Sequence, residues 1–284
     1  MKTYRELLVA RSGHGTSLRE LDPGFSPIGC DKAASVEEVE RDGLRLRRQQ
    51  YLLYAGHARS LLICLQGLDA AGKDGTIGHV FTALNPQGAR VHAFKVPSTL
   101  EADHDFLWRV HQQVPAKGEI VIFNRSHYES VLVDRVHHVV PSDVVNERYD
   151  LINAFEETLA LSGTVVLKFY LHMSEAEQLR RFKRRLEDPS RQWKISESDY
   201  TERALFPQYL EAYEELLFRT NTKHAPWFVI PADRKWFRNL AVCKIVVESL
   251  EQLKMKLPKA TVDIKDIERR YHAAHRAEKR GNGA

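Results

Sequence analysis

The residues GLDAAGKDGT (67–76) contain the pattern G-x-x-x-x-G-K and follow the continuous apolar run SLLICLQ (60–66). A buried strand, a glycine-rich turn and a helix, in this order, form a phosphate-binding loop, because the backbone N–H groups and the helix N-terminus point at phosphate oxygens. Lys73 adds a full positive charge. The alternative, a turn that binds nothing, is disfavoured because the strand, the spacing and the lysine agree. The residues expected around the phosphate are Gly67, Ala70, Ala71, Gly72, Lys73, Asp74, Gly75 and Thr76.

Two acidic residues make this loop unusual. The common motif places Ser or Thr directly after the lysine to hold magnesium, whereas this chain has Asp74 there and Thr76 two residues further on. Asp69 lies inside the loop itself. A carboxylate among phosphates is repelled unless a metal ion lies between them, so we predict that Asp69 binds Mg²⁺ or orients the accepting phosphate. The alternative is a structural turn aspartate.

Apolar runs alternate with amphipathic stretches along the chain, which predicts an α/β fold with parallel strands. The expected strands are 60–67, 89–96, 119–124, 164–171 and 225–231. The expected helices are 35–57, 73–84, 101–114, the segment between Ser142 and Gly163, a basic helix that a Ser174–Glu177 capping box begins, 200–220 and 235–254. We divide the chain into an N-terminal arm (1–58, a loop and then a helix), one domain (59–256) and a charged tail (257–284), helical or frayed.

The end of the third strand is a second candidate for chemistry, because α/β enzymes place their sites at the carboxyl ends of parallel strands. EIVIFN (119–124) ends in Asn124 and is followed by Arg125, which suits a bidentate phosphate contact. Glu129 is a candidate for supplying a carboxylate near the nucleotide or metal. The alternatives are a surface Arg–Glu pair and a strand-capping Asn. We interpret His127 as a packed or hydrogen-bonding residue rather than a general base, since phosphoryl transfer depends mainly on positioning and charge.

A basic helix and loop follow the fourth strand, at the place where nucleotide kinases carry a lid. The segment at about 180–199 is the expected lid, and its cations suit a chain of phosphates. A solvated charged face is the alternative. A nucleic-acid site is the other alternative, and it is disfavoured because the segment has no interleaved platform of stacking aromatic residues beyond Trp193. The lid residues expected to contact phosphates are Arg180, Arg181, Arg184, Arg185 and Lys194.

The stretch HDFLWRVH (104–111) lies where acceptor nucleotides dock in small kinases. Phe106 or Trp108 has the ring to stack on a base, and Arg109 has the charge to meet its phosphate. Simple core packing is the alternative, and it is the preferred interpretation of Leu107 and Trp108.

Composition sets the broad class. The chain has 284 residues, 43% of them hydrophobic, and a formal net charge of +4, which suits one large α/β domain. Its three cysteines are widely spaced and odd in number, so we expect no disulfide framework and a reducing, cytoplasmic compartment. The first residues lack the apolar core of a signal peptide, and no stretch is long enough for a membrane helix.

Several of these segments together resemble the polyphosphate kinase 2 family. They are GLDAAGKDGT (67–76), HDFLWRVH (104–111), FNRSHYESVLVDRV (123–136) and RRFKRRLEDPSRQWKIS (180–196). The resemblance runs from about residue 40 to residue 255. It implies a P-loop kinase of the thymidylate-kinase-like type, a three-layer sandwich of helices around a five-stranded parallel sheet, with a helical lid.

The resemblance also implies an activity. This would be the reversible transfer of a phosphoryl group between inorganic polyphosphate and AMP, ADP or ATP, with guanine nucleotides as further candidates and Mg²⁺ (Mn²⁺ as the alternative) as cofactor. Asp69, Lys73 and Arg125 would be the catalytic residues, and polyphosphate would thread along the lid arginines. Many members have Asp-Arg after the third strand, whereas Asn124-Arg125 followed by Glu129 resembles the branch that accepts both AMP and ADP.

Family likeness further suggests a homo-oligomer, with no membrane or nucleic-acid partner. Two rival interpretations remain. An ATP-dependent nucleotide kinase would require ATP as donor. A non-catalytic polyanion or nucleic-acid binder would show salt-sensitive binding without turnover; the presence of both Asp69 and Lys73 argues against it.

Overall fold

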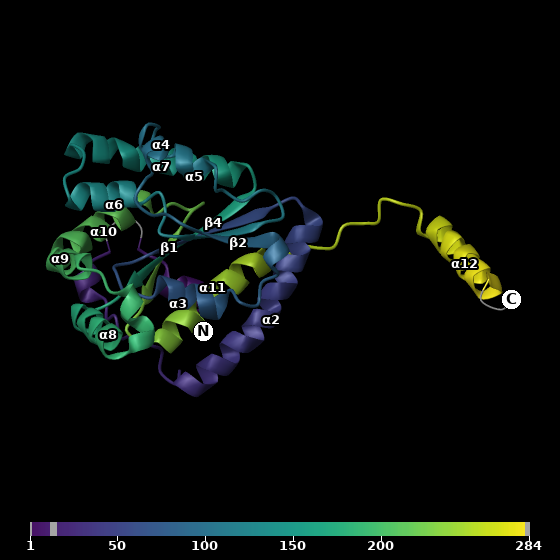
Figure 1. The fold of residues 1–284 in the computed structure, drawn as a ribbon, viewed down its shortest axis with the longest axis horizontal. Coiled ribbons are helices and arrows are strands. Elements are labelled where there is room, and N and C mark those ends of the chain that lie inside the picture. Colours follow the sequence, from purple (N-terminus) through teal and green to yellow (C-terminus); the bar gives the residue numbers. More distant parts are fainter. Residues whose placement is uncertain (1, 12–15, 282–284) are drawn as a thin grey trace.

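The structure is a computed structural model, and it describes residues 2–11 and 16–281. Its centre is a five-stranded sheet with the order β2-β3-β1-β4-β5, in which every neighbouring pair is parallel. The predicted α/β fold with five parallel strands is therefore confirmed (Figure 1). The strands are β1 (Ser60–Gln66), β2 (Ala89–Ala93), β3 (Ile120–Asn124), β4 (Thr164–His172) and β5 (Trp227–Pro231).

The central strand β1 shows why its sequence is a continuous apolar run. Leu61, Ile63 and Leu65 pack into the cluster on one face of the sheet, while Leu62 and Cys64 pack into a cluster on the other face. All of β1 is buried. Because both faces are covered by helices, alternation between apolar and polar residues is lost, as is usual for parallel sheets.

Helices cover both faces and give the predicted three layers, the arrangement of a P-loop kinase (Figure 1). One face carries α1 (Tyr4–Leu8), α2 (Lys32–Gly56), α3 (Lys73–Val80) and α11 (Lys235–Gln252). The other carries α4 (Thr99–Ala102), α5 (Trp108–His111), α6 (Glu129–Val136), α7 (Ser142–Leu161) and α10 (Phe206–Thr220). Between β4 and α10 lie α8 (Glu175–Glu187), the 3-10 helix η3 (Pro189–Lys194) and α9 (Ser198–Ala204). Two further 3-10 turns are η1 (Leu18–Glu20) and η2 (Pro86–Gly88).

Three expectations about helices were wrong. The single helix at 101–114 is instead the two short helices α4 and α5, because the Asp105 carboxylate accepts the Leu107 N–H at 2.9 Å and forms a local turn between them. The helix at 200–220 is α9 and α10, which divide at Leu205, directly before the proline-containing first turn of α10. The Ser174 hydroxyl caps α8 as predicted, but the expected capping box is incomplete, because the backbone N–H of Ser174 donates to Asp233 rather than to Glu177.

The N-terminal segment runs along β5. Val9 forms an antiparallel bridge with Phe228, and the Ala10 N–H donates to the Trp227 carbonyl at 2.8 Å. Further on, the His172 ring contacts the Leu21 carbonyl at 3.1 Å. The expected boundary at residue 58 falls in the turn between α2 and β1, while residues 1 and 12–15 of the arm lie outside the described part.

The expected tail contains a helix, α12 (Ile264–Gly281), which extends away from the body (Figure 1). Residues 282–284 of that tail lie outside the described residues. Across the described ranges, no helix combines the length and apolar character needed to cross a membrane.

Candidate active site

The site lies at the carboxyl edge of the sheet, where segments that follow all five strands meet. It is a pocket of about 790 Å³. β1 is followed by the loop of Asp69 and Lys73, β3 ends at Asn124, and β4 leads into the lid. β1 lies between β3 and β4, so the chain turns to opposite sides of the sheet there, which is the place where open α/β sheets bind ligands.

The loop after β1 has the backbone that its glycines predict. Gly67, Ala70 and Gly72 all have positive φ angles, of 153°, 65° and 107°. The loop therefore curls around the Lys73 ammonium, which donates to the Gly67 carbonyl at 2.6 Å and to the Leu68 carbonyl at 3.4 Å. Burial lowers the pKa of Lys73, and the charge of Asp69 opposes this effect.

Gly72 gives a prediction about the loop. A Cβ at this position would overlap the Arg238 guanidinium, and its φ of 107° is strained for any other residue. Gly72→Ala is expected to destabilise the fold by about 1–3 kcal/mol for the backbone alone and to lower kcat. Gly78→Ala is the matched control, because a Cβ there meets nothing within 4 Å. Melting temperatures and kcat of both variants check this, and wild-type behaviour of Gly72→Ala would contradict it.

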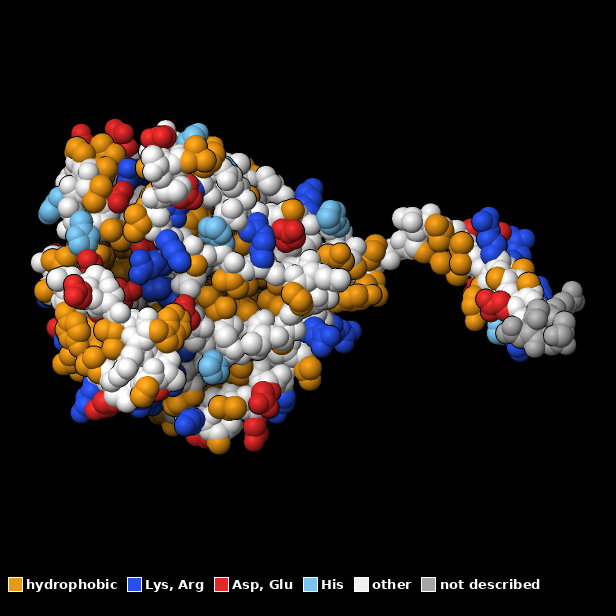
Figure 2. All heavy atoms as spheres, viewed as in Figure 1, with side chains coloured by type: hydrophobic (Ala, Val, Ile, Leu, Met, Phe, Trp, Pro, Cys, Tyr) orange, Lys and Arg blue, Asp and Glu red, His pale blue; other side chains and the backbone are white. Residues whose placement is uncertain are grey.

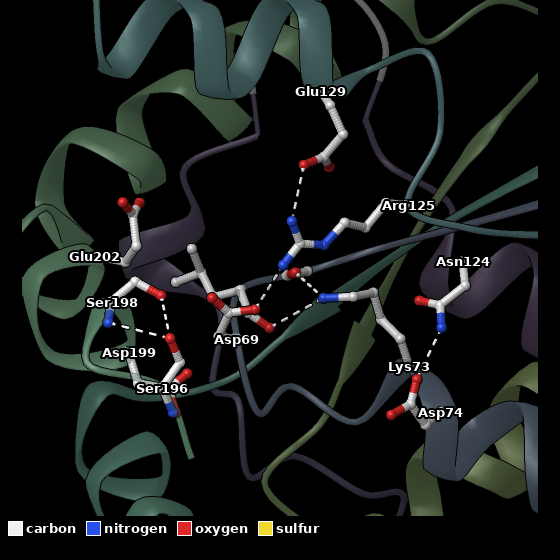
Figure 3. A network of polar contacts seen from close by, with 12 residues as sticks. Asp69, Lys73, Asp74, Asn124, Arg125, Glu129, Ser196, Ser198, Asp199 and Glu202 are labelled. Carbon is white, nitrogen blue, oxygen red and sulfur yellow. Dashed lines mark hydrogen bonds and ion pairs between the residues drawn. The ribbon is translucent and has the colours of Figure 1, made fainter. Parts of the chain in front are cut away.

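Arg125 connects two carboxylates at the mouth of the loop. Its guanidinium donates to Asp69 Oδ1 at 2.8 Å and lies 3.5 Å from Glu129 Oε2 (Figure 3). Burial raises the pKa of Glu129, although Arg125 and Lys73 oppose this rise. The side chains of Asp69 and Arg125 are 32% and 40% exposed, so both can reach a ligand while they hold each other.

Asp74, which replaces the usual Ser or Thr, joins three parts of the site. Its carboxylate accepts from Asn124 Nδ2 at 2.8 Å and from Lys194 Nζ of the lid at 3.3 Å. Partial burial would raise the pKa of Asp74, but donation from Asn124 and the charge of Lys194 lower it overall. The P-loop helix, the end of β3 and the lid are thus tied to one charged carboxylate.

Positive charge dominates the pocket. Ten Lys and Arg side chains line it against two carboxylates, those of Asp69 and Asp74. Figure 2 shows Lys and Arg side chains gathered in a hollow on this side of the body. The ten are Lys73, Lys95, Arg125, Arg181, Arg184, Arg185, Arg191, Lys194, Lys235 and Arg238. So large an excess in one pocket suits a ligand that carries several phosphates.

The lid arginines are not equivalent. The Arg184 side chain is exposed and has no ion-pair or hydrogen-bond partner within the described part of the chain. Arg185 is held by Asp199 at 3.0 Å. Arg181 is 6% exposed and donates at 2.8 Å to the carbonyls of Ala70 and Ala71, so it fastens the P-loop. Burial lowers the pKa of Arg181 to about 10.

Some predicted residues do not line the pocket. Arg180 does not line the pocket because it lies at the margin of the helix face that Arg181 and Arg184 share. The Arg180 side chain is 64% exposed and pairs with Glu177. Thr76 is buried, and its hydroxyl donates to the Gly72 carbonyl at 3.1 Å. The remaining predicted residues that do not line the pocket are Gly67, Ala71, Phe106, Arg109 and Glu129.

The two residues predicted to contact the acceptor base or its phosphate have partners within the protein. The Phe106 ring lies 5.0 Å from the Arg148 guanidinium. Arg109 donates to the Lys95 carbonyl at 2.8 Å and lies over the Phe94 ring. Their role in nucleotide binding stays a prediction. His127, interpreted as a packed residue, is indeed buried, and its Nε2 lies 3.1 Å from Glu156.

Sequence reasoning overlooked Lys235 and Arg238, which come from α11 after β5. Burial lowers the pKa of both, in Lys235 to about 8, and neighbouring arginines of the pocket add to this effect. Both follow the end of a predicted strand, so the rule that located Arg125 could have found them. Lys95, at the end of β2, also lines the pocket and follows the same rule.

The residues present fit a magnesium ion that is bound largely through substrate. The described residues hold no cluster of three or more His, Cys, Asp or Glu that would bind a metal by themselves. Mg²⁺ commonly uses one or two carboxylates together with substrate phosphates and water. Asp69 offers this, because Arg125 occupies one carboxylate oxygen and the other is available.

Comparison with known proteins agrees with this geometry. The sequence model of the polyphosphate kinase 2 family matches residues 29–258. An AMP/ADP-polyphosphate phosphotransferase of Meiothermus ruber is 49% identical over 91% of this chain and 96% of its own length. An ADP-polyphosphate phosphotransferase of Rhodopseudomonas palustris is 42% identical over 88% and 92%.

A solved structure is similar over nearly the whole chain. It is the crystal structure of polyphosphate kinase 2 from Arthrobacter aurescens TC1, with a TM-score of 0.92 and 39% identity, covering 96% of this chain and 97% of that one. The family match, these relatives and the cation-lined P-loop pocket together lead to one conclusion. This chain belongs to the polyphosphate kinase 2 family.

Proposed function

We propose that this enzyme transfers a phosphoryl group from inorganic polyphosphate to AMP and to ADP, reversibly and with Mg²⁺. The chain is a phosphotransferase of the polyphosphate kinase 2 family. The observation that carries the proposed donor is the excess of ten cationic side chains over two carboxylates around the P-loop. A donor with many phosphates can neutralise this excess, whereas a single phosphate would leave most of these cations in close mutual repulsion.

The residues suggest direct transfer without a covalent intermediate. In this proposal Lys73 and Arg125 stabilise charge on the transferring group, and the Arg184 guanidinium, which has no partner among the described residues, binds the donor chain. The contact between Lys194 and Asp74 links the lid to the loop, and closure of the lid over bound substrate would exclude water. When bound at Asp69, Mg²⁺ would reduce repulsion between donor and acceptor phosphates. Mn²⁺ is expected to substitute for it.

The residues at the end of β3 are the basis for the proposed acceptor nucleotide. Asn124 and Arg125 lie beside the P-loop, and Glu129 adds a carboxylate next to Arg125. The relative from Meiothermus ruber, which is named for both AMP and ADP, supports the acceptance of both. Adenine nucleotides are the proposed acceptors, and guanine nucleotides are further candidates. We expect a cytoplasmic protein without membrane or nucleic-acid partners.

The pH dependence of donor binding follows from Lys235. Its pKa is lowered to about 8, so in the empty enzyme the ammonium is charged below pH 8 and loses its charge as the pH rises through that value. The KM for polyphosphate is therefore expected to rise roughly tenfold between pH 7 and pH 9, as loss of a charge-assisted hydrogen bond predicts. Lys235→Arg should flatten this profile. An unchanged profile in that variant would show that another group titrates.

The donor is tested by a direct choice. Purified enzyme is given AMP and Mg²⁺ with either long-chain polyphosphate or ATP, and the rate of AMP consumption is measured. We expect polyphosphate to be sufficient, with no ATP added. A requirement for ATP would favour the nucleotide-kinase alternative. Salt-sensitive polyphosphate binding without any AMP consumption would favour the non-catalytic binder.

A second copy of the chain is the proposed partner. Val36, Leu44, Tyr51 and Tyr54 of α2 are exposed apolar residues that fall within an arc of about 80° of that helix. The helix α12, with Ile264, Ile267 and Tyr271 about half exposed or more, offers a further apolar stripe. Light scattering on the full chain and on Tyr51→Glu tests this: we expect an oligomer that the charge dissociates, whereas a monomeric full chain would contradict it.

A further inference from the structure

A fully buried ion pair lies beneath the end of β3. Lys168 of β4 and Glu156 of α7 are both 0% exposed, and Lys168 Nζ lies 2.6 Å from Glu156 Oε2. The ammonium also donates to the Tyr128 hydroxyl at 2.9 Å and to the Thr220 carbonyl at 2.7 Å. All three N–H groups of the ammonium are therefore satisfied without water.

The carboxylate of this pair holds two consecutive residues of the loop after β3. Glu156 Oε1 accepts from the Tyr128 hydroxyl at 2.8 Å and contacts His127 Nε2 at 3.1 Å. Burial lowers the pKa of His127, and because the ionised Glu156 carboxylate can only accept, His127 Nε2 is the nitrogen that donates. Its Nδ1 has no partner in the described part of the chain. The buried cluster, here Lys168, Glu156, His127 and Tyr128, thus carries one balanced pair of charges.

These two loop residues follow Arg125, whose backbone is strained. Arg125 has a φ of 62°, a left-handed conformation that costs a non-glycine residue energy. Its N–H donates to the Leu65 carbonyl at 3.1 Å, and the next residue, Ser126, accepts from Gln66 at 3.0 Å. One side of the strained turn is therefore held by β1, and the other side is held by the buried cluster.

Stability alone is a weak reason for such a pair. Replacing a buried ion pair by apolar residues of similar volume is often neutral or stabilising, because desolvation of both charges opposes their attraction. An apolar pair would not accept the His127 and Tyr128 protons, however. The geometry thus separates two roles: packing, which apolar residues could fill, and retention of this loop, which requires the carboxylate.

We propose that the buried cluster is a positioning device, which holds the peptide of Arg125 in its left-handed conformation and aims the guanidinium between Asp69 and Glu129. This inference rests on the proposed function, in which Arg125 stabilises the transferring group. None of the four cluster residues lines the pocket, so the cluster acts only through Arg125. Releasing the loop lowers kcat by a larger factor than it changes the KM values for polyphosphate and nucleotide.

Two double variants separate positioning from packing. Glu156→Leu with Lys168→Met removes both charges and the carboxylate that accepts from His127 and Tyr128. Glu156→Gln with Lys168→Met also removes both charges but keeps an amide oxygen for His127 and Tyr128. We expect the first to lower kcat about 10- to 100-fold and the second to retain most of it. Equal kcat in the two folded proteins would overturn the proposal. If the first does not fold, Tyr128→Phe takes its place, with a smaller loss of kcat expected.

A double-mutant cycle with Arg125→Ala shows whether the cluster acts through Arg125. In the Arg125→Ala background, Glu156→Leu with Lys168→Met, or Tyr128→Phe, is expected to change kcat little, because the guanidinium that the cluster positions is gone. Fully additive losses would overturn the proposal. Failure of the proposed function is distinguishable, because it would appear as wild-type enzyme without polyphosphate-driven turnover, before any variant is compared. If the wild-type enzyme is active and Arg125→Ala keeps its kcat, the positioning role is wrong while the proposed function stands.

Discussion

Replacing Lys73 with alanine is expected to lower kcat about 100- to 1,000-fold, the usual cost of losing one preorganised charge at a transferring group. The ammonium lies inside the loop, bound to the carbonyls of Gly67 and Leu68, so no neighbouring cation can take its place without moving the backbone. The fold should survive, because the change removes a buried charge and not an apolar core side chain. Steady-state kinetics and a melting curve test both parts.

The matched control for this variant is Lys183→Ala. Lys183 lies on α8 and is 72% exposed, and its ion-pair partner among the described residues is Glu187, at 3.6 Å. It does not line the pocket. We expect this control to keep wild-type kcat, because Lys183 lies outside the pocket, and wild-type stability, because exposed ion pairs contribute little to it. Near-normal turnover in Lys73→Ala would show that the loop lysine has been given the wrong role.

Asp69→Asn is expected to have the second-largest effect, a fall in kcat of about 100-fold or more, accompanied by a higher Mg²⁺ concentration for half-maximal rate. The amide keeps the size of the side chain and can still accept from Arg125, but it lacks the charge that draws a divalent cation. Mg²⁺ titrations of the rate distinguish this from a simple loss of shape.

Asp150→Asn is the control for Asp69→Asn. Asp150 is 81% exposed on α7, lies 3.8 Å from Arg219 and does not line the pocket. Its Mg²⁺ dependence should equal that of the wild type. An Asp69→Asn variant with unchanged kcat and an unchanged Mg²⁺ requirement would mean that Asp69 is a structural turn residue, the alternative that its sequence position left open.

The strands were predictable because a strand that is buried on both faces has a continuous run of apolar residues. All five apolar runs form strands, and the P-loop after β1 has the positive φ angles that its glycines allow. The helix expected at 101–114 failed because apolar residues such as Leu107 and Val110 pack into the core from short turns as well as from a long helix. Periodicity does not separate these two cases, whereas the Asp105 turn does.

The site was only partly predictable, for a different reason. Asp69, Lys73, Asn124 and Arg125 follow strands whose ends were already recognised, and the structure brings all four together. The sequence placed Arg180 and Arg181 next to each other as equivalent lid cations. Their different burial depends on what each faces across the fold, the P-loop carbonyls for Arg181 and solvent for Arg180.

The buried cluster shows a stronger limit. Lys168 stands within the apolar run TVVLKFYL (164–171), where a single lysine gives no sign of its partner. Glu156 lies in an amphipathic helix, among residues that alternate between core and solvent. Only the packing of α7 against β4 brings these charges together, so no spacing rule along the chain would have paired them.

The central claim is tested most directly by incubating purified protein with AMP, long-chain polyphosphate and Mg²⁺, without any other donor, and by quantifying nucleotides over time by chromatography. The account predicts that ADP forms first and ATP follows from it. ADP without ATP would keep the polyphosphate donor and restrict the acceptor to AMP. No product from AMP, and none when ADP is supplied instead, would contradict the account.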